Sequence, residues 1–450
     1  MHSTEGDRVS TLRLTGDADR DERAFDALAA QFGEEELESR GLSFFRIGMT
    51  AVLGDERAPD EVAALAEACL IQSVRAEWTL HSRAAILHSQ LRGDAPPAAR
   101  PTFLHGWDAE RIRAVAAGKG LILCNFHFGQ HRMVIPDAAR IGLDVAFPVT
   151  SKEAHSQYFG PALDLLGIEF MPVEDGRIGM KLIRALRTGK VVIINTDANN
   201  GADGPLGSQG RTTVSFGGRR LTVKTGIVRL ARMLGVPILP VFALPYGPGA
   251  AGRRDGYDGY IELCEPIDPA AFDGPTDEDA EHQITQALYA LLEARVRRHP
   301  VYWEYARFMH RWMEPEPVPA LPSPPDSARL LARGGVLRAD RRVATPFQRG
   351  GHVRALVHTH DFASYPAPPS QPELLDALFG PGIDAAWLRA HARSEDEQRS
   401  LLAMLDGLAA RGALAVSPPP PAPSTDHRRP PGQPLSPSAP PVAELDVASA

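Results

Sequence analysis

A histidine that follows a short apolar run is the first candidate for chemistry in this chain. The apolar run covers residues 121–124, and His127 comes shortly after it, before Gly129. Such a run predicts a buried strand, and catalytic groups commonly lie where strands end, because the loop there is open to ligand while the scaffold below is rigid. Neutral imidazole is a base near physiological pH. We therefore take His127 as the candidate general base, with a purely structural histidine as the alternative.

A second histidine raises the question of a metal site. His127 and His131 are spaced i, i+4, so on a helix both side chains could face one metal ion. The sequence offers no convergent third ligand and no Cys-x-x-Cys pair. We therefore expect no metal and no resident cofactor.

Charge, cysteine content and missing motifs exclude several classes of function. The formal net charge of -8 at pH 7 gives no support to a nucleic-acid binder. The three widely spaced cysteines indicate a reducing compartment. Ser208 lacks the glycine two positions before it that a nucleophile elbow needs, and neither a phosphate-binding loop nor a dinucleotide fingerprint occurs. Without a signal-peptide pattern or a long apolar run, we expect a cytoplasmic protein, with contact to the inner face of a membrane left open.

Apolar and helical segments alternate through the middle of the chain. This rhythm predicts an α/β sheet with helices on both faces, preceded by a helical region at 22–92. The prolines around 236–242 favour a strand start or a sheet edge. Strands are expected at 121–124, 145–149, 168–173, 191–195, 213–216, 236–242 and 260–264, and helices at 156–166, 177–187, 221–234, 278–296 and 302–312.

Shifts in composition divide the chain further. We expect a mobile N-terminus at 1–20, a large domain at 21–313, a Pro-rich linker at 314–326, a small domain at 327–417 and a disordered Pro-rich tail at 418–450. The small domain is predicted to contain strands at 342–343, 353–357 and 413–416 and helices at 373–378, 385–392 and 395–410. A hairpin, three short helices and a closing strand make a winged-helix arrangement.

Four segments in order resemble one enzyme family over residues 40–313. They are GWDAERIRAVAAGKGLILCNFHFGQ, LIRALRTGKVVIINTDANN, GRTTVSFGGRRLTVKTGIVRLARMLGVPILPVF and VYWEYARFMHRW. Together they resemble the lipid A and phosphatidylinositol mannoside branch of the lysophospholipid acyltransferase superfamily. The resemblance implies a glycerolipid acyltransferase-like fold, with a mixed sheet flanked by helices, and an acyl channel whose base is lined by 236–242.

The same resemblance implies roles for individual residues. In that family a His-x-x-x-x-Asp/Glu motif deprotonates the acceptor hydroxyl, which attacks an acyl thioester; the histidine of the motif matches His127, but the acid position holds Arg132. A guanidinium there would favour neutral imidazole and oppose the positive charge that the base must acquire. Asp197 is therefore the first candidate for the missing acid, with a turn or cap residue as the alternative reading. Asp137 and Glu174 are weaker candidates.

Glycines and arginines are the candidates for substrate binding. Gly129 belongs to the histidine motif, and Arg132 could alternatively bind an anionic substrate group. A basic, glycine-containing surface is expected to hold the phosphates of coenzyme A, of a carrier-protein arm or of an acceptor, with a turn of solvated charges as the alternative. Its expected residues are Arg211, Gly217, Arg219 and Arg220.

These predictions point to an acyltransferase that uses an acyl thioester as co-substrate. The expected donor is an acyl carrier protein or acyl-CoA, and the acceptor is a hydroxyl or amine of a lipid, glycolipid or secondary metabolite. The lipid A relatives carry an N-terminal hydrophobic anchor, whose absence here favours a small-molecule or peptide acceptor, read by the small domain as a winged-helix peptide-recognition module. Two alternatives stay open: a small domain that merely packs on the large one, and a degenerate fold that binds an acyl chain or carrier without turnover.

Overall fold

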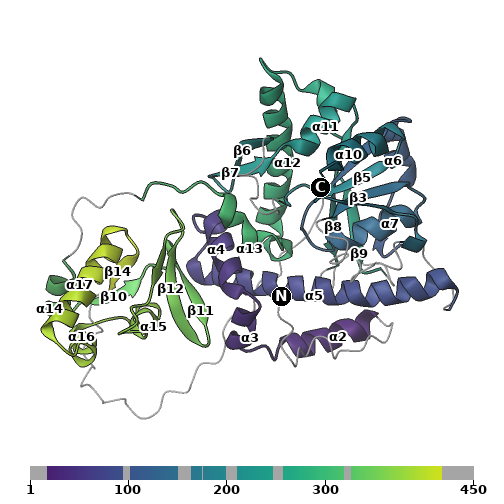
Figure 1. The fold of residues 1–450 in the computed structure, drawn as a ribbon. Coiled ribbons are helices and arrows are strands. Elements are labelled where there is room, and N and C mark those ends of the chain that lie inside the picture. Colours follow the sequence, from purple (N-terminus) through teal and green to yellow (C-terminus); the bar gives the residue numbers. More distant parts are fainter. Residues whose placement is uncertain are drawn as a thin grey trace, which may run out of the picture.

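The computed structural model describes residues 18–94, 102–149, 164–174, 176–198, 210–246, 257–318 and 326–417. They form a mixed α/β body, with one large sheet flanked by helices, and a smaller body of helices and short strands that begins at residue 326 (Figure 1). Most of the expected mobile N-terminus, most of the linker and the tail at 418–450 lie outside the described residues, as does most of the helix expected at 156–166.

Seven strands form the large sheet, in the order β1-β9-β8-β2-β5-β3-β4. Strands β8 and β9 pair antiparallel and the other neighbours pair parallel, so the sheet is mixed, as expected. Proline did not place β8 at an edge: β8 lies between β2 and β9, with Pro240 inside the strand. The strands are β1 Leu104–His105, β2 Leu121–Asn125, β3 Val145–Val149, β4 Glu169–Pro172, β5 Val191–Asn195, β8 Ile238–Pro245 and β9 Gly259–Leu263.

The sheet is buried on both faces, because alternate residues of its inner strands enter two different apolar cores. In β2, Leu121 and Leu123 belong to one core, while Ile122 and Cys124 belong to the other. Helices α6 and α7 supply the first core, and α10, α11 and α12 supply the second. The helices of this body are α2 Ala18–Ala29, α3 Glu34–Ser39, α4 Leu42–Leu53, α5 Pro59–Arg92, α6 Ala109–Ala116, α7 Val134–Arg140, α10 Ile178–Arg187, α11 Gly226–Leu234, α12 Asp277–Arg298 and α13 Ala306–Met309.

The helix predicted at 221–234 is wrong in its first part. Residues 219–224 form strand β7 (Arg219–Lys224), which pairs antiparallel with β6 (Arg211–Phe216) as a separate hairpin. Gly217 and Gly218 both have positive φ, +62° and +75°, which is the requirement of a two-residue hairpin turn. The helix expected at 302–312 is also broken, into η3 Pro300–Tyr302, α13 and η4 His310–Trp312.

The smaller body has an apolar core of its own. Its helix α17 has the predicted bounds, but 342–343 is a turn, and the closing strand β14 pairs antiparallel with β10. The prediction lacked α14, β10 and β13. The elements are α14 Ser327–Ala332, β10 Val336–Ala339, β11 Ala344–Arg349, β12 His352–His358, β13 Ser364–Pro366, α15 Leu374–Phe379, α16 Ala385–His391, α17 Glu395–Ala410 and β14 Leu414–Ser417.

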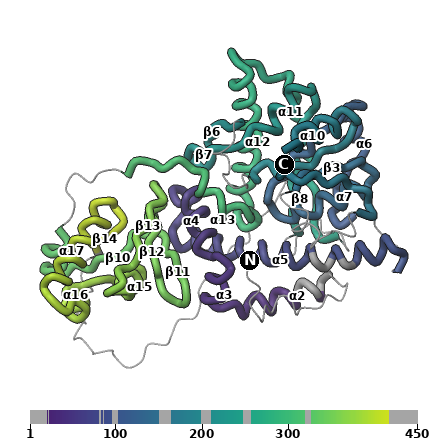
Figure 2. The backbone as a smooth tube through the Cα atoms, in the orientation of Figure 1, coloured from purple at the N-terminus to yellow at the C-terminus, as the bar shows by residue number. Residues whose placement is uncertain are grey.

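The two bodies are joined by specific polar and aromatic contacts. Figure 2 shows α4 beside β11, where the backbone N–H of Gln348 donates to Ser43 Oγ at 3.0 Å. The Phe44 and Phe347 rings meet edge to face, with centroids 5.6 Å apart. None of the helices described here is long and apolar enough to cross a membrane.

Candidate active site

The loop after β2 is held by its own aromatic residues and by main-chain hydrogen bonds. Phe126 and Phe128, on either side of His127, are wholly buried against Phe242 of β8. The Gly129 N–H then donates to the Tyr302 carbonyl at 2.8 Å. Alternating side chains after the strand therefore anchor the loop, so that His127 points away from these two phenylalanines.

Gly129 is required by the path of the chain. Its φ is +60°, and a Cβ atom at this position would lie 2.2 Å from the carbonyl oxygen of Ala243. The next residue, Gln130, donates its backbone N–H to that same oxygen at 2.7 Å. The close approach of two backbones therefore explains this glycine, without any substrate.

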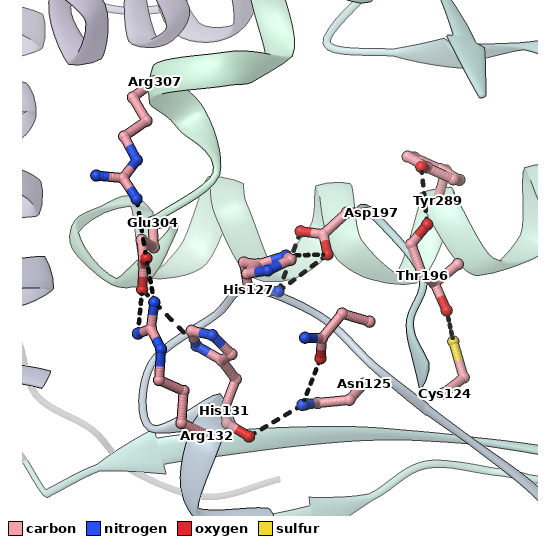
Figure 3. A network of polar contacts seen from close by, with 11 residues as sticks. Cys124, Asn125, His127, His131, Arg132, Thr196, Asp197, Tyr289, Glu304 and Arg307 are labelled. Atoms are coloured by element: carbon pink, nitrogen blue, oxygen red, sulfur yellow. Dashed lines mark hydrogen bonds and ion pairs between the residues drawn. The ribbon is translucent and has the colours of Figure 1, made fainter. Parts of the chain in front are cut away.

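His127 contacts Asp197, the carboxylate that the sequence analysis ranked first (Figure 3). The distance from His127 Nδ1 to Asp197 Oδ1 is 2.8 Å, and the backbone N–H of His127 donates to both oxygens, at 3.0 and 3.1 Å. The Asp197 side chain is fully buried, whereas that of His127 is 14% exposed. The carboxylate is therefore held in one orientation, and the imidazole keeps an opening.

Strand register explains how two residues so far apart in sequence meet. Strands β2 and β5 are parallel neighbours, with Asn125 opposite Asn195 at their ends. His127 and Asp197 each lie two positions beyond these asparagines, so both loops leave the same edge of the sheet in step. Asn125 also links the strand ends, since its amide donates to Asn195 Oδ1 at 2.9 Å.

This geometry selects a tautomer of His127. A proton on Nδ1 is donated to Asp197, which leaves the lone pair on Nε2 free to accept a proton. The buried carboxylate then stabilises the imidazolium that forms. Two rings confine the imidazole: Tyr305 stacks on it and His131 meets it edge-on, each with a centroid distance of 4.9 Å. This arrangement of base and carboxylate is one that can carry out general acid–base chemistry.

Arg132 is paired with Glu304, which is not among the site residues predicted from the sequence. The guanidinium donates two hydrogen bonds to the carboxylate, of 2.8 and 2.7 Å. Burial alone would raise the pKa of Glu304, but the charge and hydrogen bonds of Arg132, with the charge of Arg307, outweigh it and hold that pKa well below its ordinary value. The charge of Arg132 is therefore compensated by a permanent carboxylate, instead of opposing a positive charge on His127.

His131 is buried and kept neutral. Burial, followed by the nearby charge of Arg132, lowers the pKa of this imidazole well below its ordinary value. Its side chain is 2% exposed, and Nδ1 lies 3.9 Å from Glu304. The described residues contain no group of three His, Cys, Asp or Glu side chains that could hold a metal ion.

The basic surface predicted around 217–220 is not formed as expected. Arg219 is buried and donates to the Thr359 carbonyl of the smaller body at 2.7 Å, so its prediction as a surface anion site is wrong. Arg220 pairs with Glu314 at 2.6 Å, and Gly217 approaches Val52 of α4. Arg211 is exposed at the start of β6.

The weaker acid candidates lie elsewhere. Asp137 is buried and accepts the backbone N–H groups of Phe103 and Leu104, each at 2.8 Å. Burial raises the pKa of Asp137 to about 7, against these hydrogen bonds, and the residue ties α7 to the segment before α6. Glu174 is exposed in the turn after β4. Neither has a contact with His127 among those described.

Glu304 gave little signal in the sequence beyond its place in an aromatic segment, between Trp303 and Tyr305. Both neighbours are buried, which could have indicated that the glutamate also faces inward. Its backbone N–H donates to the His127 carbonyl at 3.1 Å, so this segment supports the histidine loop directly. Comparison with protein-family models gives no match for this chain, and comparison with curated proteins gives none either.

Proposed function

We propose that this chain is an acyltransferase that moves a fatty acyl group from an acyl thioester to a hydroxyl or amine. The donor is acyl-CoA or an acyl carrier protein, and the acceptor is a lipid, glycolipid, peptide or secondary metabolite. One observation carries the proposal: the 2.8 Å contact between the partly open His127 imidazole and the fully buried Asp197 carboxylate, at the ends of adjacent parallel strands.

The reaction follows from the tautomer of the histidine. Nε2 of His127 takes the proton of the acceptor hydroxyl while the acceptor oxygen bonds to the thioester carbonyl carbon. The carbon–sulfur bond then breaks, and the leaving thiolate recovers the proton from the imidazolium. The hydrogen bond from Nδ1 to Asp197 lowers the free energy of the imidazolium in both steps.

Arg132 is compatible with this chemistry. Its charge is matched by Glu304, which supports a working site in which Asp197 fills the part of the acid expected at position 132. The degenerate binding fold was suggested by that same arginine. The pairing with Glu304 supports the enzyme over that alternative.

The proposal also covers the fold of the larger body and that of the smaller body. A mixed sheet between helices, with a histidine loop at the ends of its parallel strands, supports a glycerolipid acyltransferase-like body. A hairpin with three helices supports a winged-helix-like smaller body, which in this proposal positions a peptide or carrier-protein partner. That body contacts α4 and β7, which supports a role for it beside the acyltransferase-like body.

The test measures turnover of radiolabelled acyl thioesters, including slow hydrolysis when no acceptor is present. We expect His127→Ala and Asp197→Asn each to lower the rate by about 10²- to 10⁴-fold, because one removes the base and the other its orienting charge. Glu174→Gln is the matched control, since it removes an exposed carboxylate. Circular dichroism confirms that each variant is folded.

The opposite result is equally specific. If the wild-type protein neither transfers nor hydrolyses the acyl group, and His127→Ala binds acyl thioesters as the wild type does, the chain is an acyl- or carrier-binding protein. Equal rates for the wild type and His127→Ala would also exclude the proposed base.

A further inference from the structure

Arginines gather around one phenylalanine beside the candidate base. The guanidinium carbon of Arg307 lies 4.6 Å from the centroid of the Phe308 ring, and that of Arg311 lies 5.2 Å from it. Both contacts are within the range of a cation–π interaction. The ring therefore holds two long, flexible side chains near one place on the surface.

The charges in this cluster do not balance. Arg132 and Arg307 both donate to Glu304, so two guanidinium groups share one carboxylate. The described residues offer Arg311 no carboxylate within ion-pairing distance, and Arg311 is exposed. His131 and His310 add no charge near neutral pH, since burial lowers the pKa of both. In the cluster of Arg132, Arg307 and Arg311, the excess of positive charge therefore lies at Arg307 and Arg311.

The cluster lies close to the candidate base. The Tyr305 ring stands between them, with its centroid 4.9 Å from that of His127 and 5.4 Å from that of Phe308. On the other side, Arg132 follows His131, whose ring touches His127. Figure 3 shows Arg132 and Arg307 on opposite sides of Glu304, with His127 beside them.

Arg307 keeps N–H donors that Glu304 does not occupy. The side chains of Arg132 and Arg307 are each 30% exposed although both contact Glu304. Arg307 makes a single hydrogen bond of 3.3 Å to that carboxylate, and a guanidinium has five N–H groups. Guanidinium groups match the geometry of phosphate oxygens with paired hydrogen bonds.

We propose that Arg307 and Arg311, with Arg132 behind them, bind a phosphate group of the substrate while the reacting carbonyl lies at His127. This inference rests on the proposed function and adds the chemical class that the site recognises. The phosphate comes either from the donor, as in coenzyme A or a phosphopantetheine arm, or from a phosphorylated acceptor. Glu304 keeps the guanidinium groups oriented and tempers their mutual repulsion.

The experiment compares Arg307→Gln/Arg311→Gln with the wild type. Arg329→Gln/Arg389→Gln, two exposed arginines of the smaller body, is the control with the same change of charge. Binding of coenzyme A and of inorganic phosphate is measured by calorimetry, and KM is measured for acyl-CoA and for S-acyl pantetheine, which has no phosphate. Arg132 is left in place, because its removal would leave Glu304 without its main partner.

If the bound phosphate belongs to the donor, the double variant should raise the dissociation constant of coenzyme A and the KM for acyl-CoA by at least about tenfold. The KM for S-acyl pantetheine and the value of kcat should stay within about twofold. If the bound phosphate belongs to the acceptor, the double variant should bind inorganic phosphate more weakly, and its KM for both donors should be unchanged.

The proposal is overturned if the wild type binds neither coenzyme A nor phosphate, or if the double variant binds both as the wild type does. Binding by the wild type that the double variant loses, without any turnover, would keep the phosphate site and reject the acyltransferase. Turnover by the wild type, together with equal binding of coenzyme A and phosphate by the double variant, would keep the acyltransferase and reject the phosphate site. The two proposals therefore fail separately.

Discussion

The loop after β2 and the β6–β7 hairpin differ in a way that their sequences do not reveal. Both combine glycine with arginine, and both were expected to bind substrate. In the loop, Arg132 pairs with a buried carboxylate of its own body. In the hairpin, Arg219 is buried against a main-chain carbonyl of the other body. The first arginine lies beside the candidate base, whereas the second joins two bodies.

This difference teaches that the position of a guanidinium in the fold decides its role, since Arg219 too has a carboxylate nearby, with an oxygen of Glu316 at 3.8 Å. Beside the candidate base, the Arg132 side chain is 30% exposed although it is paired with Glu304. Between the two bodies, the Thr359 carbonyl and the Phe362 ring, whose centroid lies 5.6 Å from the guanidinium carbon, leave Arg219 nearly enclosed. Composition alone makes the two segments look alike.

The largest expected effect comes from reversing the charge in the loop. Arg132→Glu would place a second carboxylate against buried Glu304, and we expect the free energy of unfolding to fall by about 3–5 kcal/mol. Urea denaturation measures this. The exchange Arg132→Glu/Glu304→Arg should recover at least half of the loss, and an exchange that is no more stable than the single variant would show that the ion pair is unimportant.

The next largest effect is expected from replacing two glycines at which another segment of the chain comes close to the backbone. Gly129→Ala would drive a Cβ atom to 2.2 Å from a backbone oxygen, whereas Gly217→Ala would meet a Val52 side chain at 2.8 Å. Both also acquire strain from a positive φ. We expect losses of about 3 kcal/mol for Gly129→Ala and about 1–2 kcal/mol for Gly217→Ala. Equal unfolding midpoints for the two variants would mean that the loop after β2 accommodates the extra Cβ atom as easily as the hairpin does.

Neighbouring arginines of the hairpin provide a matched pair. Arg219→Gln leaves the Thr359 carbonyl buried without its donor, and we expect a loss of about 1–3 kcal/mol in unfolding free energy. Arg220→Gln removes a surface ion pair with Glu314 and should change stability by less than about 1 kcal/mol. A loss for Arg220→Gln as large as that for Arg219→Gln would contradict the interface role of Arg219.

The smallest expected effect is a dependence on pH in the loop. The folded protein keeps His131 neutral with a lowered pKa, whereas the unfolded chain takes up a proton below its ordinary value of 6.5. Stability should therefore fall as the pH drops below 6.5, by about 1 kcal/mol for this group between pH 7.5 and 5.5. Glu304, whose folded pKa is also lowered, adds to the loss only below its ordinary value of 4.5.

His131→Gln isolates that contribution. As the pH falls from 7.5 to 5.5, the urea midpoint of the wild type should fall more than that of the variant, because only the wild type has the buried His131. His310, whose pKa burial lowers to about 4, titrates in both proteins and cancels. A difference that does not change with pH would mean that the His131 pKa is ordinary.

Local patterns predicted many of the elements. Strands β3 and β5 and helix α17 have the predicted bounds, because apolar periodicity is set by neighbouring residues and because Ser394 caps the helix. The pattern failed at 219–224, where a short alternating run precedes a helix and only pairing with β6 decides for a strand. Pro240 misled in the same way, since its place inside β8 depends on both neighbouring strands.

For the candidate site, the sequence by itself determined that an apolar strand ends at a histidine, and that a glycine follows it. Asp197 is the first of the three carboxylates predicted to assist His127. Its contact with His127, 70 residues away, depends on the register of β2 and β5. The pairing of Arg132 with Glu304 spans 172 residues and had no local signal. Only the tertiary structure decided these contacts, because a side chain's partner depends on which strands and loops become neighbours, and that follows from packing the whole chain.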